Sequence, residues 1–134
     1  MAVLVDSNVL LDLMTEDARW FSWSQHALDA AADRSRLVIN AIIYAEVSVR
    51  FSRIEDLEAA LPKDLINREH LPYEAAFLAA KAFAAYRARG GKRTSTLPDF
   101  FIGAHAAVAQ HELLTRDGTR YRTYFPKLKI TAPE

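Results

Sequence analysis

The 134-residue sequence contains no cysteine, and no run of apolar residues in it approaches the length that crosses a membrane. Without cysteine there is no disulfide and no thiolate metal site. A transmembrane helix needs about 20 consecutive apolar residues, so no membrane association is expected. The N-terminus also lacks the basic flank of a signal peptide. We therefore expect a cytoplasmic protein.

The composition is otherwise ordinary, with 51% hydrophobic and 25% charged residues, and it predicts a single domain over residues 1–134. The formal net charge is zero but unevenly spread. Residues 87–134 carry 9 basic and 4 acidic side chains, against 8 and 13 in residues 1–86. A basic region suits a nucleic-acid partner, although a solvated surface with uneven charge explains it equally well.

Short apolar runs alternate with helical stretches along the chain. The expected strands are residues 2–5, 36–39, 112–115 and 128–130, with 65–67 as a strand or connector. The expected helices are residues 9–14, 15–32, 41–51, a short helix with a capping box at 52–55, 73–89 and 98–110, followed by a helical turn at 121–125. This alternation predicts an α/β fold with a parallel sheet and helices on both of its faces.

The first expected strand ends at a carboxylate, in the sequence Asp6-Ser7-Asn8. Ligands of open parallel sheets bind just outside the carboxyl ends of the strands, which makes Asp6 a candidate site residue. The same residue type also caps helices, and a purely structural role for Asp6 remains open.

Three further acids occupy places that can converge with Asp6 on one edge of the sheet. Glu46 lies inside an apolar helix, Asp99 begins a helix after Pro98, and Asp117 follows a strand. Each has a structural alternative: an ion pair of Glu46 with Arg50, a helix-dipole contact for Asp99, and an Asp-Gly turn for Asp117. Carboxylates gathered in one cleft would repel one another, and Mg²⁺ or Mn²⁺ would relieve that repulsion. Such a site suits phosphodiester hydrolysis.

The chain resembles the PIN-domain ribonucleases, and in particular the VapC-type toxins of bacterial toxin–antitoxin pairs. The resemblance covers essentially the whole chain. It rests on four segments, which are Val5-Asp6-Ser7-Asn8-Val9-Leu10-Leu11-Asp12, Ala45-Glu46, Leu97-Pro98-Asp99-Phe100-Phe101-Ile102-Gly103-Ala104-His105-Ala106 and Leu113-Leu114-Thr115-Arg116-Asp117. It implies a three-layer α/β/α PIN-like domain with a central parallel sheet of 4–5 short strands.

The resemblance also implies roles for individual residues. Asp6 and Asp99 would bind Mg²⁺ directly, with Mn²⁺ as a substitute, and Asp117 would complete the metal site. Glu46 would help to hold the metal or orient the attacking water. Asn8 and Thr115 would act as hydrogen-bonding groups around the ligands.

The family resemblance extends to substrate and partners. It implies cleavage of single-stranded or structured RNA such as tRNA, leaving a 5′-phosphate and a 3′-hydroxyl. It also implies a homodimer and inhibition by a cognate VapB-like antitoxin, with which the toxin would form a hetero-oligomer. The expected RNA-binding residues are basic: Lys92, Arg93, Arg116 and Arg120. The segment before Pro98 is longer and more basic than in many relatives, which leaves the substrate preference open.

Other titratable residues are assigned structural roles. The histidines at 26, 70, 105 and 111 lack the spacing of zinc ligands, so we expect surface or packing roles for them. Asp12 is expected to be a solvated acid on its helix. Two alternative functions remain, namely a PIN-type nuclease for RNA processing or DNA flaps without an antitoxin, and a non-catalytic binding module on the same fold. The presence of all four acids counts against the second.

Overall fold

The computed structural model describes residues 1–90 and 96–133. Five short strands form one parallel sheet in the order β3-β2-β1-β4-β5. Their bounds are β1 (Val3–Val5), β2 (Leu37–Ile39), β3 (Ile66–Arg68), β4 (Glu112–Leu114) and β5 (Ile130–Thr131). This confirms the predicted α/β class with a central parallel sheet.

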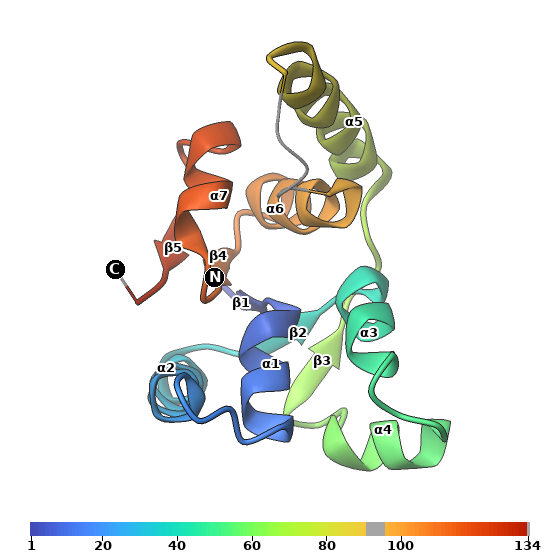
Figure 1. Cartoon of the computed structure of the whole chain (residues 1–134), viewed down its shortest axis with the longest axis vertical. Helices are drawn as coiled ribbons and strands as arrows, with labels where there is room; N and C mark the ends of the chain where they lie inside the picture. The colour runs from blue at the N-terminus through green and yellow to red at the C-terminus, as the bar shows by residue number, and fades with distance from the viewer. Residues whose placement is uncertain (91–95, 134) are drawn as a thin grey trace.

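Seven helices, counted over the described residues, cover the two faces of the sheet. They are α1 (Ser7–Met14), α2 (Phe21–Arg34), α3 (Ala41–Ser48), α4 (Ile54–Ala60), α5 (Tyr73–Ala88), α6 (Leu97–Ala109) and α7 (Gly118–Tyr124). Figure 1 shows α1 to α4 on one side of the sheet and α5 to α7 on the other. Parallel crossovers are right-handed, so a sheet that grows first to one side and then to the other receives its helices on opposite faces.

The direction of sheet growth reverses at β1, which pairs with both β2 and β4. The chain leaves β1 at Asp6 and leaves β4 at Thr115, side by side, and the Asp6 backbone N–H donates to the Leu114 carbonyl oxygen at 2.9 Å. A reversal of this kind opens a crevice at the carboxyl ends of the strands, where open α/β sheets bind ligands. The fold therefore places Asp6 and Thr115 at its natural binding position.

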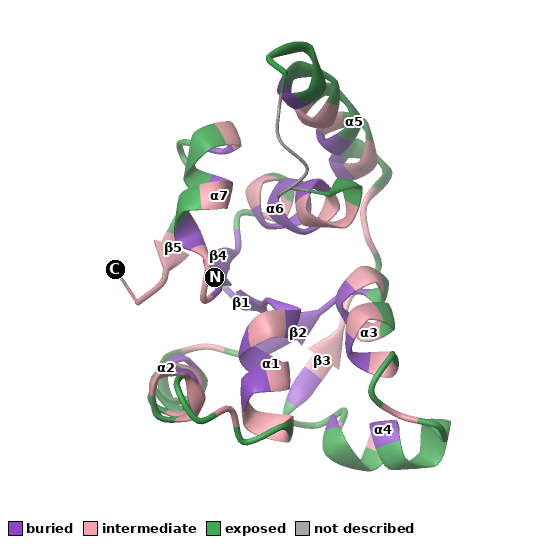
Figure 2. Ribbon diagram, in the orientation of Figure 1, coloured by how far each residue is buried: buried purple, intermediate pink, exposed green. Residues whose placement is uncertain are grey.

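The core lies around the three central strands. Val3, Leu4 and Val5 of β1 are fully buried, and Figure 2 shows β1, β2 and β4 as buried while much of α4 and α5 is exposed. Each Val or Leu side chain buried in this way contributes about 1.5–3 kcal/mol to the stability of the fold. Among the described residues, no helix has the length and apolar character needed to span a bilayer.

Several element bounds differ from the predictions. Helices α1 and α7 begin at Ser7 and Gly118, before the expected residues 9 and 121, and β5 covers Ile130–Thr131 instead of residues 128–130. The helix expected from residue 15 begins at Phe21, because the Asp17 carboxylate accepts hydrogen bonds from the backbone N–H groups of Arg19 and Trp20 and holds a turn there. The capping box expected at 52–55 is absent, since α4 follows Arg53 without a side-chain cap. Asn40 caps α3, and its Oδ1 accepts from the Ile43 N–H at 3.0 Å.

Candidate metal-binding acid site

Asp6 is the buried centre of the site, with 4% of its surface exposed. Its Oδ1 accepts a hydrogen bond from the Ser7 backbone N–H at 2.8 Å, so the residue caps α1. Its Oδ2 accepts from the hydroxyls of Thr115 at 2.8 Å and Tyr121 at 2.9 Å. The structural and the functional interpretations of Asp6 are thus compatible, because the cap fixes the carboxylate at the edge of the sheet.

Glu46 reaches the same place from α3. The Ser7 hydroxyl donates to Glu46 Oε1 at 2.8 Å, and Ser7 directly follows Asp6, so one residue links the two acids. The hydrogen-bond partner of Glu46 is therefore Ser7 of α1, where the sequence alone offered Arg50 as an ion-pair partner. Ser7 was given no role in the sequence analysis although it lies inside the first motif.

Asp99 lies in the first turn of α6, where it completes a capping box with Thr96. Its Oδ2 accepts from the Thr96 backbone N–H at 2.9 Å, from the Thr96 hydroxyl at 3.2 Å and from Arg120 Nη1 at 3.0 Å. The helix start thus holds the carboxylate, and α7 supplies a positive charge to it.

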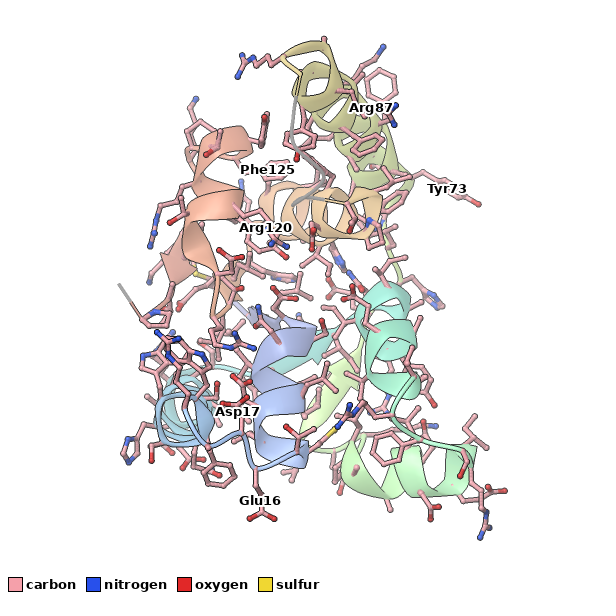
Figure 3. The ribbon with its side chains drawn as sticks, viewed as in Figure 1. Glu16, Asp17, Tyr73, Arg87, Arg120 and Phe125 are labelled. Atoms are coloured by element: carbon pink, nitrogen blue, oxygen red, sulfur yellow. The ribbon has the colours of Figure 1, made fainter. Side chains whose placement is uncertain are left out.

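Asp117 immediately precedes α7 and is half-exposed. Its Oδ2 lies 3.0 Å from Arg120 Nη2, so the guanidinium of Arg120 bridges Asp99 and Asp117. Figure 3 labels Arg120, whose side chain extends from α7 toward α6. The backbone N–H of Asp117 also donates to Thr115 Oγ1 at 3.1 Å, which ties the residue to the end of β4.

The charges of the acids act on one another. Burial raises the pKa of Asp6, and the negative charge of Asp99 raises it further, while hydrogen bonds from Thr115, Tyr121 and Ser7 oppose the shift. Burial likewise raises the pKa of Glu46, with contributions in the same direction from Asp6 and Asp99 and an opposing one from Arg120. A cation bound beside Asp6 and Glu46 would therefore favour their deprotonated forms.

Asn8 and Thr115, the two polar residues expected around the acids, contact each other, and Thr115 also contacts Asp6. Asn8 Nδ2 donates to Thr115 Oγ1 at 3.3 Å, and Asn8 Oδ1 accepts from the backbone N–H of Arg116 at 3.1 Å. Asn8 thus joins α1 to the segment after β4, and the Thr115 hydroxyl contacts Asp6 directly.

Tyr121 was missed by the sequence analysis, which assigned it only to a helical turn. Its ring is buried and its hydroxyl contacts Asp6, an arrangement that depends on Gly103 of α6. A Cβ at Gly103 would lie 2.5 Å from the Phe125 ring and 3.0 Å from that of Tyr121. The only sequence signal was a glycine one turn after Asp99, because a buried tyrosine by itself is common in protein cores.

The expected RNA-binding residues have different surroundings. Lys92 and Arg93 lie outside the described residues. The guanidinium of Arg116 is held in an ion pair: its Nε and Nη2 donate to the two carboxylate oxygens of Asp12 at 2.9 and 3.1 Å. The expectation that Asp12 is solvated is wrong: it is 2% exposed and also accepts from the Ser24 hydroxyl. The sequence around either residue could not predict this ion pair, because 104 residues separate its partners.

A second cluster of titratable groups joins Glu69, His105 and His111. Glu69 Oε1 lies 2.8 Å from His105 Nε2 and 2.7 Å from His111 Nε2. Burial raises the pKa of Glu69, but the hydrogen bonds from His111 and His105 outweigh it and the net shift is downward. Both histidines are buried, which agrees with the packing role expected for them.

These three residues bring their ligand atoms within 4.8 Å of one another, which the four acids do not do. The hydrogen bonds nevertheless argue against a metal. Asn40 Oδ1 is used by the Ile43 N–H, so Asn40 Nδ2 donates to His105 Nδ1, and the proton of His105 must lie on Nε2, the atom a metal would need. His111 Nδ1 has no hydrogen-bond partner among the described residues, although a metal-bound histidine needs one for that nitrogen.

A cavity of about 520 Å³ also lies near this cluster, lined by His111, Phe125 and Lys127 among others. None of the four acids is among its lining residues. The acid site is instead an edge of the sheet at which the four acids meet Arg120 and the polar side chains that hold them.

Comparison with known proteins adds to this geometry. The family model described as PIN domain matches residues 3–126. Among solved structures, a toxin–antitoxin complex from Klebsiella pneumoniae contains a chain 23% identical, with a TM-score of 0.72 and coverage of 99% of this chain and 98% of that one. A chain of VapBC-1 from nontypeable Haemophilus influenzae is 18% identical, with a TM-score of 0.75 and coverage of 98% of both chains. VapBC2 from Rickettsia felis, bound to a promoter DNA fragment, gives 14% identity, a TM-score of 0.75 and coverage of 98% of both chains. No curated protein matches the sequence.

Proposed function

Because the chain belongs to the PIN domain family of nucleases, we propose that it is a Mg²⁺-dependent endoribonuclease of the VapC type, a toxin that a cognate antitoxin neutralises. Its substrate would be tRNA or another structured or single-stranded RNA. We also propose that residues 1–134 act as one domain, since the family match runs through most of that length.

The observation that carries this proposal is the meeting of four acids with a single bridging arginine at the reversal point of the sheet. Asp6 and Glu46 are joined through Ser7, and Asp99 and Asp117 through Arg120. Carboxylate oxygens are the ligands that Mg²⁺ and Mn²⁺ prefer. Burial, with a smaller contribution from neighbouring acids, raises the pKa values of Asp6 and Glu46, and a bound cation would oppose that rise. The residues therefore fit a divalent cation.

Each acid receives a proposed role. Asp6 and Asp99 would be direct metal ligands and Asp117 would complete the set. A divalent metal bound here would polarise the phosphoryl oxygen and activate water. Glu46, whose pKa is raised, would accept a proton from the attacking water and orient it. Thr115 would fix the Asp6 carboxylate through its hydroxyl, and Asn8 would fix Thr115.

Binding of RNA would depend on the basic residues around these acids. We propose Arg120 as the nearest phosphate contact, with Lys92 and Arg93 supplying charge from the segment before α6. Arg116 would attract RNA through its charge more than through direct hydrogen bonds to phosphates, because two of its nitrogens already donate to Asp12. Each phosphate contact that is lost should reduce the salt dependence of RNA binding.

The proposed partners follow from the structural neighbours, which come from toxin–antitoxin complexes. We propose a VapB-like antitoxin that covers the acid site, and a homodimer of this chain within a toxin–antitoxin hetero-oligomer. The expected cytoplasmic location is part of the same proposal.

Cleavage of total cellular RNA by the purified chain tests the nuclease directly. We expect fragments with Mg²⁺ or Mn²⁺ and none with EDTA. Asp6→Asn and Asp99→Asn should each reduce the rate by at least about a thousandfold, because each removes a charge that would hold the metal at the reacting phosphate. Asp29→Asn is the matched control, since it makes the same chemical change at an exposed position of α2.

Circular dichroism of every variant separates loss of chemistry from loss of fold. Full cleavage by folded Asp99→Asn would refute the assignment. Metal-independent cleavage would refute the proposed cofactor. Cleavage of DNA flaps with intact RNA would favour the alternative PIN nuclease.

A further inference from the structure

Arg120 has an unusual position for a residue expected to bind RNA. Its guanidinium donates from Nη1 to Asp99 Oδ2 and lies with Nη2 3.0 Å from Asp117 Oδ2. Its side chain is 31% exposed, so it is partly withdrawn from solvent. Each of the two terminal guanidinium nitrogens thus contacts one acid, and the proposed function assigns both acids as metal ligands.

The influence of Arg120 extends beyond these two contacts. Its charge opposes the rise in the pKa of Glu46 and the rise in the pKa of Tyr121, the tyrosine that donates to Asp6. Within the described residues, Arg116, which follows β4 at the same edge, pairs with Asp12 instead. Arg120 is therefore the cation that offsets the charge of the acid cluster.

A guanidinium and a divalent metal cannot use the same carboxylate oxygens at full strength. A metal drawn to Asp99 and Asp117 meets oxygens that already accept hydrogen bonds from Arg120 and a positive charge at hydrogen-bond distance from them. Two like charges a few ångströms apart repel by one to several kcal/mol even with the screening of a protein surface. Metal binding must therefore displace Arg120 or be weakened by it.

We propose that Arg120 is an internal counter-cation that competes with the divalent metal for Asp99 and Asp117. In the metal-free protein it neutralises the acids and keeps them from repelling one another. When the metal binds, Arg120 is released from the two acids toward the mouth of the site. This inference rests on the proposed metal site, and it makes Arg120 a regulator of metal affinity in addition to a contact for RNA.

The test is a calorimetric titration of Mn²⁺ alone into the purified chain and its variants, without RNA. Arg120→Gln should bind Mn²⁺ at least about tenfold more tightly than the wild type, because the competitor and its charge are gone. Arg120→Lys keeps the charge and should stay within about threefold of the wild type. Lys127→Gln, which removes one charge from an exposed position beyond the end of α7, should change nothing.

A second readout uses thermal unfolding. Without metal, Arg120→Gln should unfold at a lower temperature than the wild type, and the rise in its unfolding temperature on adding Mn²⁺ should be larger. If Arg120→Gln does not fold, Arg120→Met replaces it with a side chain of similar length and no charge.

The outcomes separate the two proposals. If Asp99→Asn loses Mn²⁺ binding but neither neutral variant at 120 binds more tightly than the wild type, the metal site stands and the counter-cation is refuted. If Asp99→Asn binds Mn²⁺ as well as the wild type, the proposed metal site itself is refuted. Weaker binding by Arg120→Gln would also overturn the inference, because it would mean that Arg120 supports the metal.

Discussion

The acid site and the Glu69–His105–His111 cluster are both built from titratable side chains, yet their charges are balanced in different ways. In the histidine cluster one carboxylate accepts from two imidazoles, and Asn40 fixes the proton of His105. In the acid site Arg120 pairs with two of the four carboxylates, Asp99 and Asp117, while Asp6 and Glu46 accept hydrogen bonds from hydroxyl groups. In the first arrangement the carboxylate is matched by two imidazole donors, whereas in the second the contacts of Arg120 pair only two of the four acids with a cation. Closeness of potential ligands is therefore a poorer guide to a metal site than the balance of donors and acceptors.

The largest effect that would sharpen this contrast is expected from His105→Ala. The side chain is fully buried on α6 against Asn40, the cap of α3, so its removal leaves a cavity and takes a partner from both Glu69 and Asn40. We expect a loss of about 3 kcal/mol in the free energy of unfolding, measured with urea. Mn²⁺ affinity of the folded fraction should stay within about twofold of the wild type. A large fall in Mn²⁺ affinity would contradict the separation of the two clusters.

A smaller effect, confined to the acid site, is expected from Tyr121→Phe. The change removes only the hydroxyl that donates to Asp6 Oδ2 and leaves the ring packed beside Gly103. We expect Mn²⁺ affinity to fall about tenfold, since partners that orient a ligand contribute 10- to 100-fold. Calorimetry measures the affinity. Tyr124→Phe, an aromatic control one turn later on α7, should leave it unchanged. Unchanged affinity in Tyr121→Phe would show that Thr115 and Ser7 alone suffice to orient Asp6.

The smallest expected effect is a difference in pH dependence between the clusters. The raised pKa values of Asp6 and Glu46 mean that these groups favour folding below their ordinary values of 3.8 and 4.5, and that this contribution is lost as the pH rises through the raised values. Mn²⁺ needs the deprotonated forms, so its effect on the unfolding temperature should be smaller at pH 5 than at pH 7.

The contribution of His105 to stability depends on pH in the opposite direction. Burial lowers the pKa of His105, so its stabilising contribution is present above the ordinary value of 6.5 and is lost as the pH falls through the lowered value. The metal-free protein should therefore lose stability on acidification through His105, and His105→Ala should lose less. A thermal unfolding series from pH 7 to pH 5, with and without Mn²⁺, measures both trends. Equal Mn²⁺ effects at the two pH values would contradict the involvement of Asp6 and Glu46.

The sequence determined the architecture because its signals are local. Apolar triplets specify the buried strands β1 and β2, Asn40 caps a helix by a contact three residues away, and glycines or prolines limit α5 and α6. The sequence also predicted that Asp6 and Asp117 share one edge of the sheet, since each follows a strand and the carboxyl ends of parallel strands meet at the same edge.

Only the tertiary structure decided which side chains meet there. Ser7 joins Asp6 to Glu46 across 39 residues, Tyr121 reaches Asp6 across 115, and Arg116 is drawn to Asp12 across 104. Nothing near Asp12 in the sequence distinguishes a buried ion pair from a solvated acid, and nothing near Arg120 shows that its guanidinium faces two carboxylates. Helix and strand signals act over a few residues, whereas electrostatic partners are chosen by packing, and packing exists only once the chain has folded.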